Sequence, residues 1–287
     1  MNDLPKVTNK NYKKYLRTYL PEIPIEKLEH IYRRGGDSIA FWYGDDRILK
    51  VGRNDDSRTS MRFEFELLTY LHQFDHAITL PEPVTLHEES LYVVYKRIDG
   101  EVLTPDAVAG FSPEQRSSFA ESMGSFLSFL HTHDFPTALT DQMEVEEDTF
   151  DVLHRRSLRR LEFLRAHEDA HIDYEQSKAD LGRLHDVSHP DLAVIHCDLK
   201  IDHVLATRSG LHDFSIIDFA DTLIGDRYGD LLRMELPRDL LDMLCEQYAH
   251  DVSELENRIE FRNLDMEIGR VYKAVEKEHR QALKEKS

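Results

Sequence analysis

Residues 194–230 read VIHCDLKIDHVLATRSGLHDFSIIDFADTLIGDRYGD. The segment holds two short apolar runs, 204–206 and 214–217, separated by polar residues and a glycine. Two such runs on either side of a glycine-containing turn predict a β-hairpin. Asp198 and His203 stand ahead of the first arm, and Asp218 follows the second. Antiparallel pairing of the arms would therefore bring these three side chains together at one end of the hairpin.

The side chains at that end have the chemistry of a metal-assisted reaction. Oxygen and nitrogen ligands at one strand end suit a hard divalent cation, and Asp198 is placed to act as a base. Phosphoryl transfer needs such an arrangement, with an aspartate that orients a hydroxyl and two ligands for Mg²⁺. Protein kinases use the spacing H-x-D-x-x-x-x-N followed by D-F-G. Here His203 replaces the Asn and Ala220 replaces the Gly. We therefore predict His203 and Asp218 as the metal ligands.

The continuation from Ile217 through Gly225 to Asp230 resembles the small-molecule kinases of the aminoglycoside phosphotransferase and choline kinase group. A histidine at the second metal-ligand position is similar to the aminoglycoside 2''-phosphotransferases. Lys200, two residues after Asp198, is instead the protein-kinase residue, and it is predicted to contact the γ-phosphate as charge moves. The resemblance extends over about residues 20–260.

This resemblance implies an α+β, two-lobed protein-kinase-like fold. A small β-rich N-lobe with leading helices, residues 1–98, would bind the nucleotide. A larger, mostly helical C-lobe, residues 99–287, would carry the catalytic loop and the acceptor site. Mg²⁺ and a nucleoside triphosphate would lie between the lobes, with monomer and homodimer both open as assembly states.

A glycine pair near the N-terminus leads into two predicted strands. Residues 38–43 and 47–51 form these strands on either side of a Gly44-Asp45 turn. A lid of this kind can cover phosphates with backbone N–H groups, so we predict phosphate contacts from Gly35, Gly36, Asp37 and Ser38. Lys50 alternates out of the second strand, where a kinase keeps its phosphate-binding lysine. An ordinary surface lysine at a strand end is the alternative.

The resemblance assigns three further parts of the nucleotide site. Residues 61–73 follow a helical pattern, and Glu64, followed by Leu four residues later, matches the family glutamate that holds the lysine. Backbone groups from Lys96 to Ile98 would contact the purine edge. Tyr95 would close the back of the base pocket. A bulky Tyr there is similar to 2''-phosphotransferases that accept GTP, so ATP and GTP are both candidate donors.

Composition bounds the class of protein. The chain has 287 residues, 36 Lys and Arg against 55 Asp and Glu, and a net charge of −19. Such a surface is a poor partner for nucleic acid and would steer a cationic small molecule inward, although acidity can also serve solubility alone. The apolar runs are too short to span a bilayer, and two cysteines give no disulfide framework. We expect a cytoplasmic protein without a membrane partner.

Acidic residues near the C-terminus are candidates for acceptor binding. Carboxylates on one helix could receive substrate ammonium groups through charge-assisted hydrogen bonds, or they could form an ordinary solvated face. These residues are Glu235, Asp239, Asp242 and Glu246.

The preferred function is O-phosphorylation of a small cationic hydroxylated molecule, most of all an aminoglycoside. A metabolic kinase of the same group, acting on choline, a sugar or an amino alcohol, is one alternative. A protein kinase is disfavoured because no A-P-E segment follows Asp218. A nucleotide-binding pseudokinase is the non-enzymatic alternative, with His203 and Ala220 as its lesions.

Overall fold

The computed structural model describes residues 5–31, 38–87, 89, 91–146, 149–167, 171–186, 191–207 and 214–285. The chain divides into two compact units, which are treated separately below. The first comprises Met1–Met143, His196–Leu223 and Arg233–Ala249, and the second comprises Glu144–Ile195, Ile224–Leu232 and His250–Ser287. Among the described residues, no helix combines the length and apolar character needed to cross a membrane. The predicted lobe boundary at residue 98 stays a prediction.

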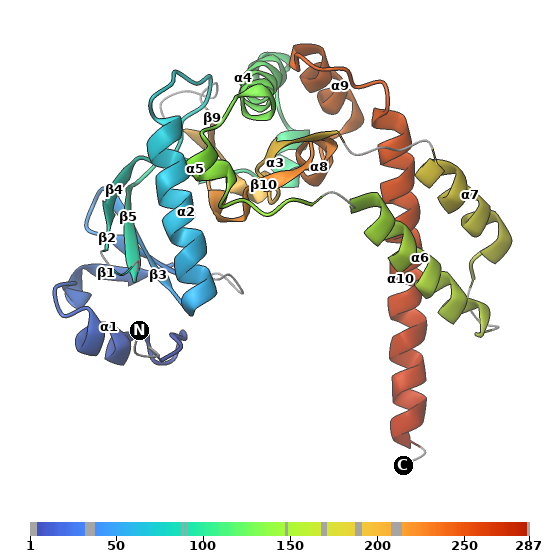
Figure 1. Cartoon of the computed structure of the whole chain (residues 1–287), viewed down its shortest axis with the longest axis horizontal. Helices are drawn as coiled ribbons and strands as arrows, with labels where there is room; N and C mark the ends of the chain where they lie inside the picture. The colour runs from blue at the N-terminus through green and yellow to red at the C-terminus, as the bar shows by residue number, and fades with distance from the viewer. Residues whose placement is uncertain are drawn as a thin grey trace. The chain divides into compact units, whose positions relative to one another are not determined.

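A five-stranded antiparallel sheet begins the first unit, with strand order β1-β2-β3-β5-β4 (Figure 1). The strands are β1 (Leu28–His30), β2 (Ser38–Tyr43), β3 (Arg47–Gly52), β4 (Pro83–Leu86) and β5 (Tyr92–Lys96). Helix α1 (Tyr12–Tyr19) and a 3₁₀ turn at Ile25–Lys27 precede them. The predicted strands around Lys50 are thus present.

Two helices cover this sheet from different sides. Alternate residues of β3, Leu49 and Val51, are buried in one apolar cluster with Tyr15 and Leu16 of α1. Because side chains alternate along a strand, Lys50 points to the other face. Helix α2 (Asp55–Leu71) runs along that face and packs on β3, β4 and β5. Asn54 starts α2 with a capping box that it completes with Ser57, which fixes where the helix begins.

The predicted hairpin forms a second sheet in the same unit. Strand β8 (Val204–Thr207) pairs antiparallel with β9 (Phe214–Ile216), with Val204 opposite Ile216, and β6 (Gly100–Val102) joins the other edge of β8. The prediction of this hairpin is confirmed. Short 3₁₀ turns at Ile201–His203 and Phe219–Asp221 flank its arms. The hairpin ends that carry the predicted site are therefore neighbours.

Helices complete the first unit. They are α3 (Pro105–Ala109), α4 (Pro113–Thr132), α5 (Thr137–Thr140) and α9 (Arg238–Gln247). Ser112 and Gln115 form a capping box ahead of Pro113, so α4 starts where its sequence signature lies. Helices α4 and α9 pack on each other.

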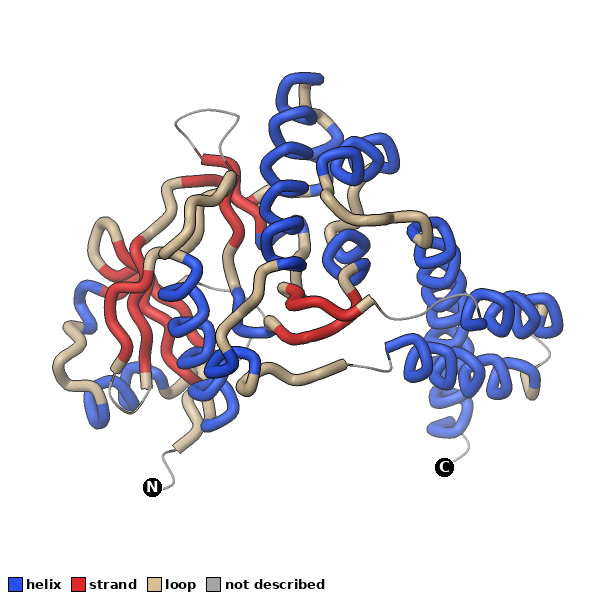
Figure 2. Tube along the Cα trace, turned by 45° about the horizontal axis from the view of Figure 1, so that its top comes forward, coloured by secondary structure: helices blue, strands red, loops and turns tan. Residues whose placement is uncertain are grey.

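The second unit is mainly helical. Helices α6 (Thr149–Arg165), α7 (Tyr174–Asp186) and α10 (Leu255–Glu285) lie side by side (Figure 2). Their shared core includes Leu161, Leu181, Phe261 and Ile268. Strands β7 (Leu192–Ile195) and β10 (Leu223–Asp226) pair with each other, and helix α8 (Tyr228–Arg233) follows β10.

Candidate active site

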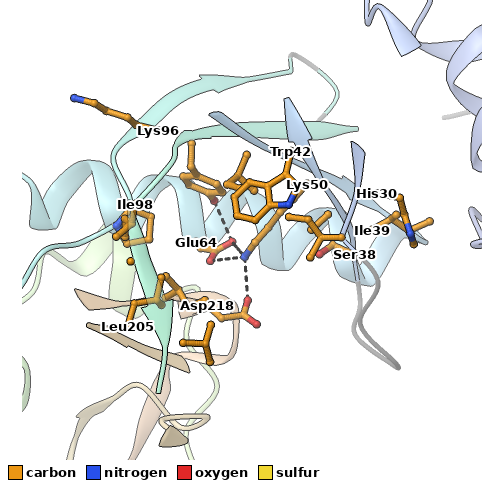
Figure 3. A pocket seen from close by; sticks show the side chains of 18 of the residues that line it. His30, Ser38, Ile39, Trp42, Lys50, Glu64, Lys96, Ile98, Leu205 and Asp218 are labelled. Atoms are coloured by element: carbon orange, nitrogen blue, oxygen red, sulfur yellow. Dashed lines mark hydrogen bonds and ion pairs between the residues drawn. The ribbon is translucent and has the colours of Figure 1, made fainter. Parts of the chain in front are cut away.

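Lys50 and Glu64 form the first contact of the site. The Lys50 Nζ donates to both carboxylate oxygens of Glu64, at 2.9 and 3.0 Å (Figure 3). Glu64 is only 1% exposed, and a buried carboxylate is costly unless its oxygens are hydrogen-bonded. The Tyr95 hydroxyl donates to Oε2 at 3.0 Å, and the Phe219 backbone N–H donates to Oε1 at 3.1 Å. Glu64 therefore joins α2 to β3, to β5 and to the segment after the hairpin.

Glu66, the other acid considered on this helix, lies elsewhere. Its Oε2 accepts a hydrogen bond from Gln142 in an exposed position. The choice of Glu64 over Glu66 as the partner of Lys50 agrees with the structure.

Asp218 completes an ion-paired group at the end of the hairpin. Its Oδ1 lies 2.9 Å from the Lys50 Nζ, and its Oδ2 lies 3.8 Å from the His203 Nε2. The other ring nitrogen of His203, Nδ1, donates to the Asp198 carbonyl oxygen at 2.8 Å. That hydrogen bond fixes the imidazole so that Nε2 is turned toward Asp218.

Residues of the predicted catalytic loop lie around Asp198. The Lys200 Nζ lies 2.5 Å from the Asp198 Oδ1. The buried His196 donates from Nε2 to the Ile217 carbonyl oxygen at 3.2 Å, which ties the loop to the end of the second hairpin arm. The loop that carries Asp198 is therefore attached to Ile217, the residue that precedes Asp218.

Two residues here have left-handed backbone conformations. Cys197 has φ 68° and Asp218 has φ 74°, values that residues other than glycine adopt at an energetic cost. Such conformations persist where surrounding contacts enforce them, and they concentrate at functional sites. Cys197 immediately precedes Asp198, so both strained positions adjoin the predicted chemistry.

The charges at the site are mutually stabilised. Burial lowers the pKa of the Lys50 ammonium, but the carboxylates of Asp218 and Glu64 outweigh burial and hold that pKa above its ordinary value. The Lys50 ammonium holds the pKa of Asp218 well below its ordinary range, against the opposing effect of burial. Burial, reinforced by the Glu64 carboxylate, raises the pKa of the Tyr95 hydroxyl well above its ordinary value. At neutral pH the site holds a charged amine, an ionised carboxylate and a neutral phenol.

A cavity of about 300 Å³ opens beside these groups. Apolar side chains from the strands and from the segment after β5 line one part, and Lys50, Glu64 and Asp218 line another (Figure 3). The apolar part includes Trp42, Ile48, Ile98, Val102, Leu205 and Ile217. Such walls suit a flat aromatic ring, and the Lys50 ammonium in the charged part can contact an anionic tail. Ser38, Tyr95 and Lys96 line the same cavity, whereas Gly35, Gly36 and Asp37 lie outside the described residues.

Sequence reasoning did not single out Trp42 or Leu205 as cavity residues. The Arg97 guanidinium lies 4.3 Å from the centre of the Trp42 ring, a cation–π contact that supports this wall. The alternation of side chains along β2 could have predicted Trp42 as a cavity residue, because Trp42, Ala40 and Ser38 share the face of the strand that lines the cavity.

The acidic residues proposed for the acceptor do not line this cavity. Asp239 pairs with Arg116 at 2.5 Å, and Asp242 pairs with Arg238 at 2.8 Å. All four acids are exposed, and Glu235 has a left-handed φ of 51°. The structure thus gives Asp239 and Asp242 protein partners, and acceptor binding by Glu235, Asp239, Asp242 and Glu246 stays a prediction.

The donors fit a metal ion that arrives with a ligand of its own. In the described part of the chain, no group of three or more His, Cys, Asp or Glu side chains is placed to hold an ion. His203 and Asp218 supply one nitrogen and one oxygen, and Mg²⁺ is commonly held by one or two protein ligands together with substrate phosphates. Two protein donors therefore agree with a metal–nucleotide site.

Most of the chain matches one known protein family. The family described as APH, phosphotransferase enzyme family, matches residues 30–261. The chain belongs to this phosphotransferase family. The predicted resemblance to small-molecule phosphotransferases, and with it the assignment as a phosphotransferase enzyme, is confirmed. No curated protein sequence matches this phosphotransferase.

Solved structures resemble this phosphotransferase over most of its length. The streptomycin–ATP ternary complex of APH(2")-IIa is 18% identical, with a TM-score of 0.63, covering 91% of this chain and 90% of that one. The GDP complex of wild-type aminoglycoside 2'-phosphotransferase-IIIa is 19% identical, with a TM-score of 0.68, covering 97% and 96%. Macrolide 2'-phosphotransferase MphH from Brachybacterium faecium is 17% identical, with a TM-score of 0.65, covering 94% and 96%. The predicted two-lobed kinase-like α+β fold is confirmed.

Proposed function

We propose that this phosphotransferase moves the γ-phosphate of a nucleoside triphosphate to a hydroxyl group of an aminoglycoside. The observation that supports the proposal is the pairing of Lys50 with Asp218 at the charged part of the cavity. His203 lies beside Asp218, and Asp198 lies on the adjoining loop. Phosphoryl transfer depends mainly on positioning and charge neutralisation, and these residue types supply both.

The nucleotide would lie with its base between Trp42, Ile48 and Leu205 and with its phosphates toward Lys50. Backbone groups of Lys96 and Ile98 would contact the edge of the base. The complexes of the structural neighbours contain ATP in one case and GDP in another, which supports a purine nucleotide as donor. Tyr95 is held by Glu64 at the back of the cavity, and ATP and GTP are both candidates.

His203 and Asp218 would hold Mg²⁺, which neutralises phosphate charge when bound. The Nδ1 hydrogen bond of His203 to the Asp198 carbonyl keeps Nε2 available for this purpose. The intact Lys50, Glu64 and Asp218 contacts favour this reading over a pseudokinase, because the replacement of the usual Gly by Ala220 leaves them in place.

Asp198 would orient the acceptor hydroxyl and take its proton. The acceptor oxygen forms a bond to the γ-phosphorus while the bond from that phosphorus to the bridging oxygen breaks, and nucleoside diphosphate leaves. The Lys200 Nζ, 2.5 Å from the Asp198 Oδ1, would lie where it can contact the transferred group.

The acceptor class rests on charge and on the neighbours. A net charge of −19 attracts polycations, and the neighbour complexes include an aminoglycoside. A macrolide is the second candidate, because macrolide 2'-phosphotransferases are among the structural neighbours.

Nucleotide turnover tests the proposal. Diphosphate release is measured with ATP and with GTP, each alone and with panels of aminoglycosides, macrolides and choline, and the products are checked by mass spectrometry for an added phosphate. We expect stimulation and phosphorylation with an aminoglycoside. Stimulation by macrolides alone would select the second candidate, and stimulation by choline alone would favour the metabolic alternative. Turnover that no acceptor stimulates would contradict the proposed acceptor class.

A further inference from the structure

Arg53 lies at the junction between strand β3 and helix α2. It follows Gly52, the last residue of β3, and precedes Asn54, the N-cap of α2. Its side chain lines the same cavity as Lys50. Arg53 was not among the site residues predicted from the sequence.

The N-terminal segment anchors Arg53. Its Nη2 donates to the Asn9 Oδ1 at 2.9 Å, and its carbonyl oxygen accepts from the Val7 backbone N–H at 2.9 Å. Asn9 also lines the cavity. Val7 and Asn9 both precede residue 30, where the family match begins. A segment outside the matched region thus contributes to the wall of the nucleotide cavity.

The strand register places Arg53 beyond Lys50, away from the apolar part. Along the β2–β3 ladder, Trp42 faces Ile48, then Ala40 faces Lys50, then Ser38 faces Gly52. The chain therefore passes from the apolar wall to the lysine and then to Arg53. Three residues of strand extend about 10 Å. A nucleotide with its base near Trp42 and its inner phosphates at Lys50 would have Arg53 beyond those phosphates, on the side away from the base.

Arg53 also has hydrogen-bonding capacity that the described protein residues do not use. Its Nε is buried without a hydrogen-bond partner, and no described carboxylate forms an ion pair with the guanidinium. The guanidinium carries five N–H donors, and the contact with Asn9 uses one of them. Phosphate oxygens are strong acceptors for a guanidinium that lines the cavity. The pKa of His30, another cavity residue, is lowered by burial first and by the Arg53 charge second, so this charge acts on the cavity wall.

We propose that Arg53, positioned by Asn9, binds the terminal phosphate of the nucleotide and makes the site prefer triphosphates to diphosphates. This inference rests on the proposed function, because it assigns a specificity residue to the same nucleotide site. The N-terminal segment then acts as part of the phosphate-binding site rather than as packing alone.

Equilibrium binding to the full chain tests the assignment. Affinities are measured for the magnesium salts of non-hydrolysable ATP and GTP analogues, for ADP and GDP, and for adenosine and guanosine. Arg53→Gln should weaken binding of the triphosphate analogue at least tenfold, as expected for a lost charge-assisted hydrogen bond, and should leave nucleoside affinity unchanged. Diphosphate affinity should fall much less than triphosphate affinity.

Arg47→Gln is the matched control. Arg47 lies on the same strand at its opposite end, is exposed, and does not line the cavity, so this variant removes the same charge elsewhere. Asn9→Ala should weaken triphosphate binding in wild type and add little in the Arg53→Gln background, because Asn9 acts through Arg53.

The outcomes separate this inference from the proposed function. Equal triphosphate affinities for Arg53→Gln and Arg47→Gln would overturn the assignment of Arg53 and leave the proposed function standing. Equal losses for nucleoside and triphosphate in Arg53→Gln would reduce Arg53 to a structural role and would also overturn it. Failure of the wild-type chain to bind any triphosphate would overturn the proposed function itself.

Discussion

The Lys50 ammonium lies 2.9 Å from the Asp218 Oδ1, although 168 residues separate the two in sequence. The other carboxylate oxygen of Asp218 is turned toward His203. One carboxylate thus connects Lys50 of the five-stranded sheet to His203, the other predicted metal ligand. Side-chain alternation in β3 orients Lys50, and the antiparallel pairing of β8 and β9 brings Asp218 close to His203.

Glu64→Gln should lower both stability and activity. The variant removes the charge that pairs with Lys50, so the free energy of unfolding should fall by about 2 kcal/mol, the usual range for a hydrogen bond to a charged group. Turnover should fall at least about tenfold because Lys50 loses its orientation. Thermal denaturation and steady-state kinetics measure the two effects. Glu66→Gln is the control and should change neither quantity appreciably, because Glu66 lies on the same helix and its hydrogen-bond partner among the described residues is the exposed Gln142.

Asp198→Asn should abolish phosphoryl transfer and retain nucleotide binding. An amide cannot take the acceptor proton, and loss of a general base commonly costs 10²–10⁴-fold, roughly, in rate. Product formation and nucleotide affinity are measured on the same preparation. Asp202→Asn is the control, since Asp202 is an exposed carboxylate in the same loop. Transfer by the Asp198 variant at the wild-type rate would remove that residue from the mechanism.

Acidification should slow turnover through His203. The pKa of Asp218 is lowered and the pKa of Lys50 is raised, so both stay charged from pH 5 to pH 9 or so. Asp218 has a lowered pKa in the folded protein, so the stability that it contributes is present above its unfolded pKa and is lost as pH falls through its folded pKa. Lys50 has a raised pKa in the folded protein, so its contribution is present below its unfolded pKa and is lost as pH rises through its folded pKa. Imidazole binds a metal only in its neutral form, so protons compete with the metal for a histidine ligand as pH falls.

Rates at saturating Mg²⁺ check this expectation between about pH 5.5 and pH 8, a range in which histidine changes charge. His203→Asn restores the protein-kinase residue and cannot be protonated there, so its profile should be flatter than that of the wild type. Superimposable profiles for the two proteins would speak against His203 as a ligand.

Tyr95→Phe should destabilise the fold by about 2 kcal/mol, the usual contribution of one hydrogen bond to a charged group. The folded pKa of Tyr95 is raised, so the stability linked to its protonation is fully present below the unfolded pKa and is lost as pH rises above it. The advantage of the wild type over the variant should hold at neutral pH and shrink above about pH 10. Denaturant titrations at several pH values measure it, and an advantage that grew in alkali would be inconsistent with this contact.

Local pattern predicted the hairpin and the face of β3 that carries Lys50, because both depend on short-range alternation and turn chemistry. The Glu64 contact required a family resemblance, since periodicity places Glu64 on a helix without naming its partner. The acidic face of α9 shows the limit of such reasoning. Asp239 pairs with Arg116, 123 residues away, and only tertiary packing of α4 on α9 reveals that partner. The contact between Arg53 and Asn9 was not predicted, because the two residues are 44 positions apart in the sequence and share no motif.

The most direct measurement of the central claim is the affinity of Asp218→Asn for the magnesium salts of non-hydrolysable ATP and GTP analogues, compared with the wild type and with free nucleosides. The claim predicts that the variant binds the triphosphate at least about tenfold more weakly, because a charged metal ligand is lost, while nucleoside affinity is unchanged. Equal triphosphate affinity in the variant and the wild type would contradict the placement of the metal–nucleotide complex between Lys50 and Asp218.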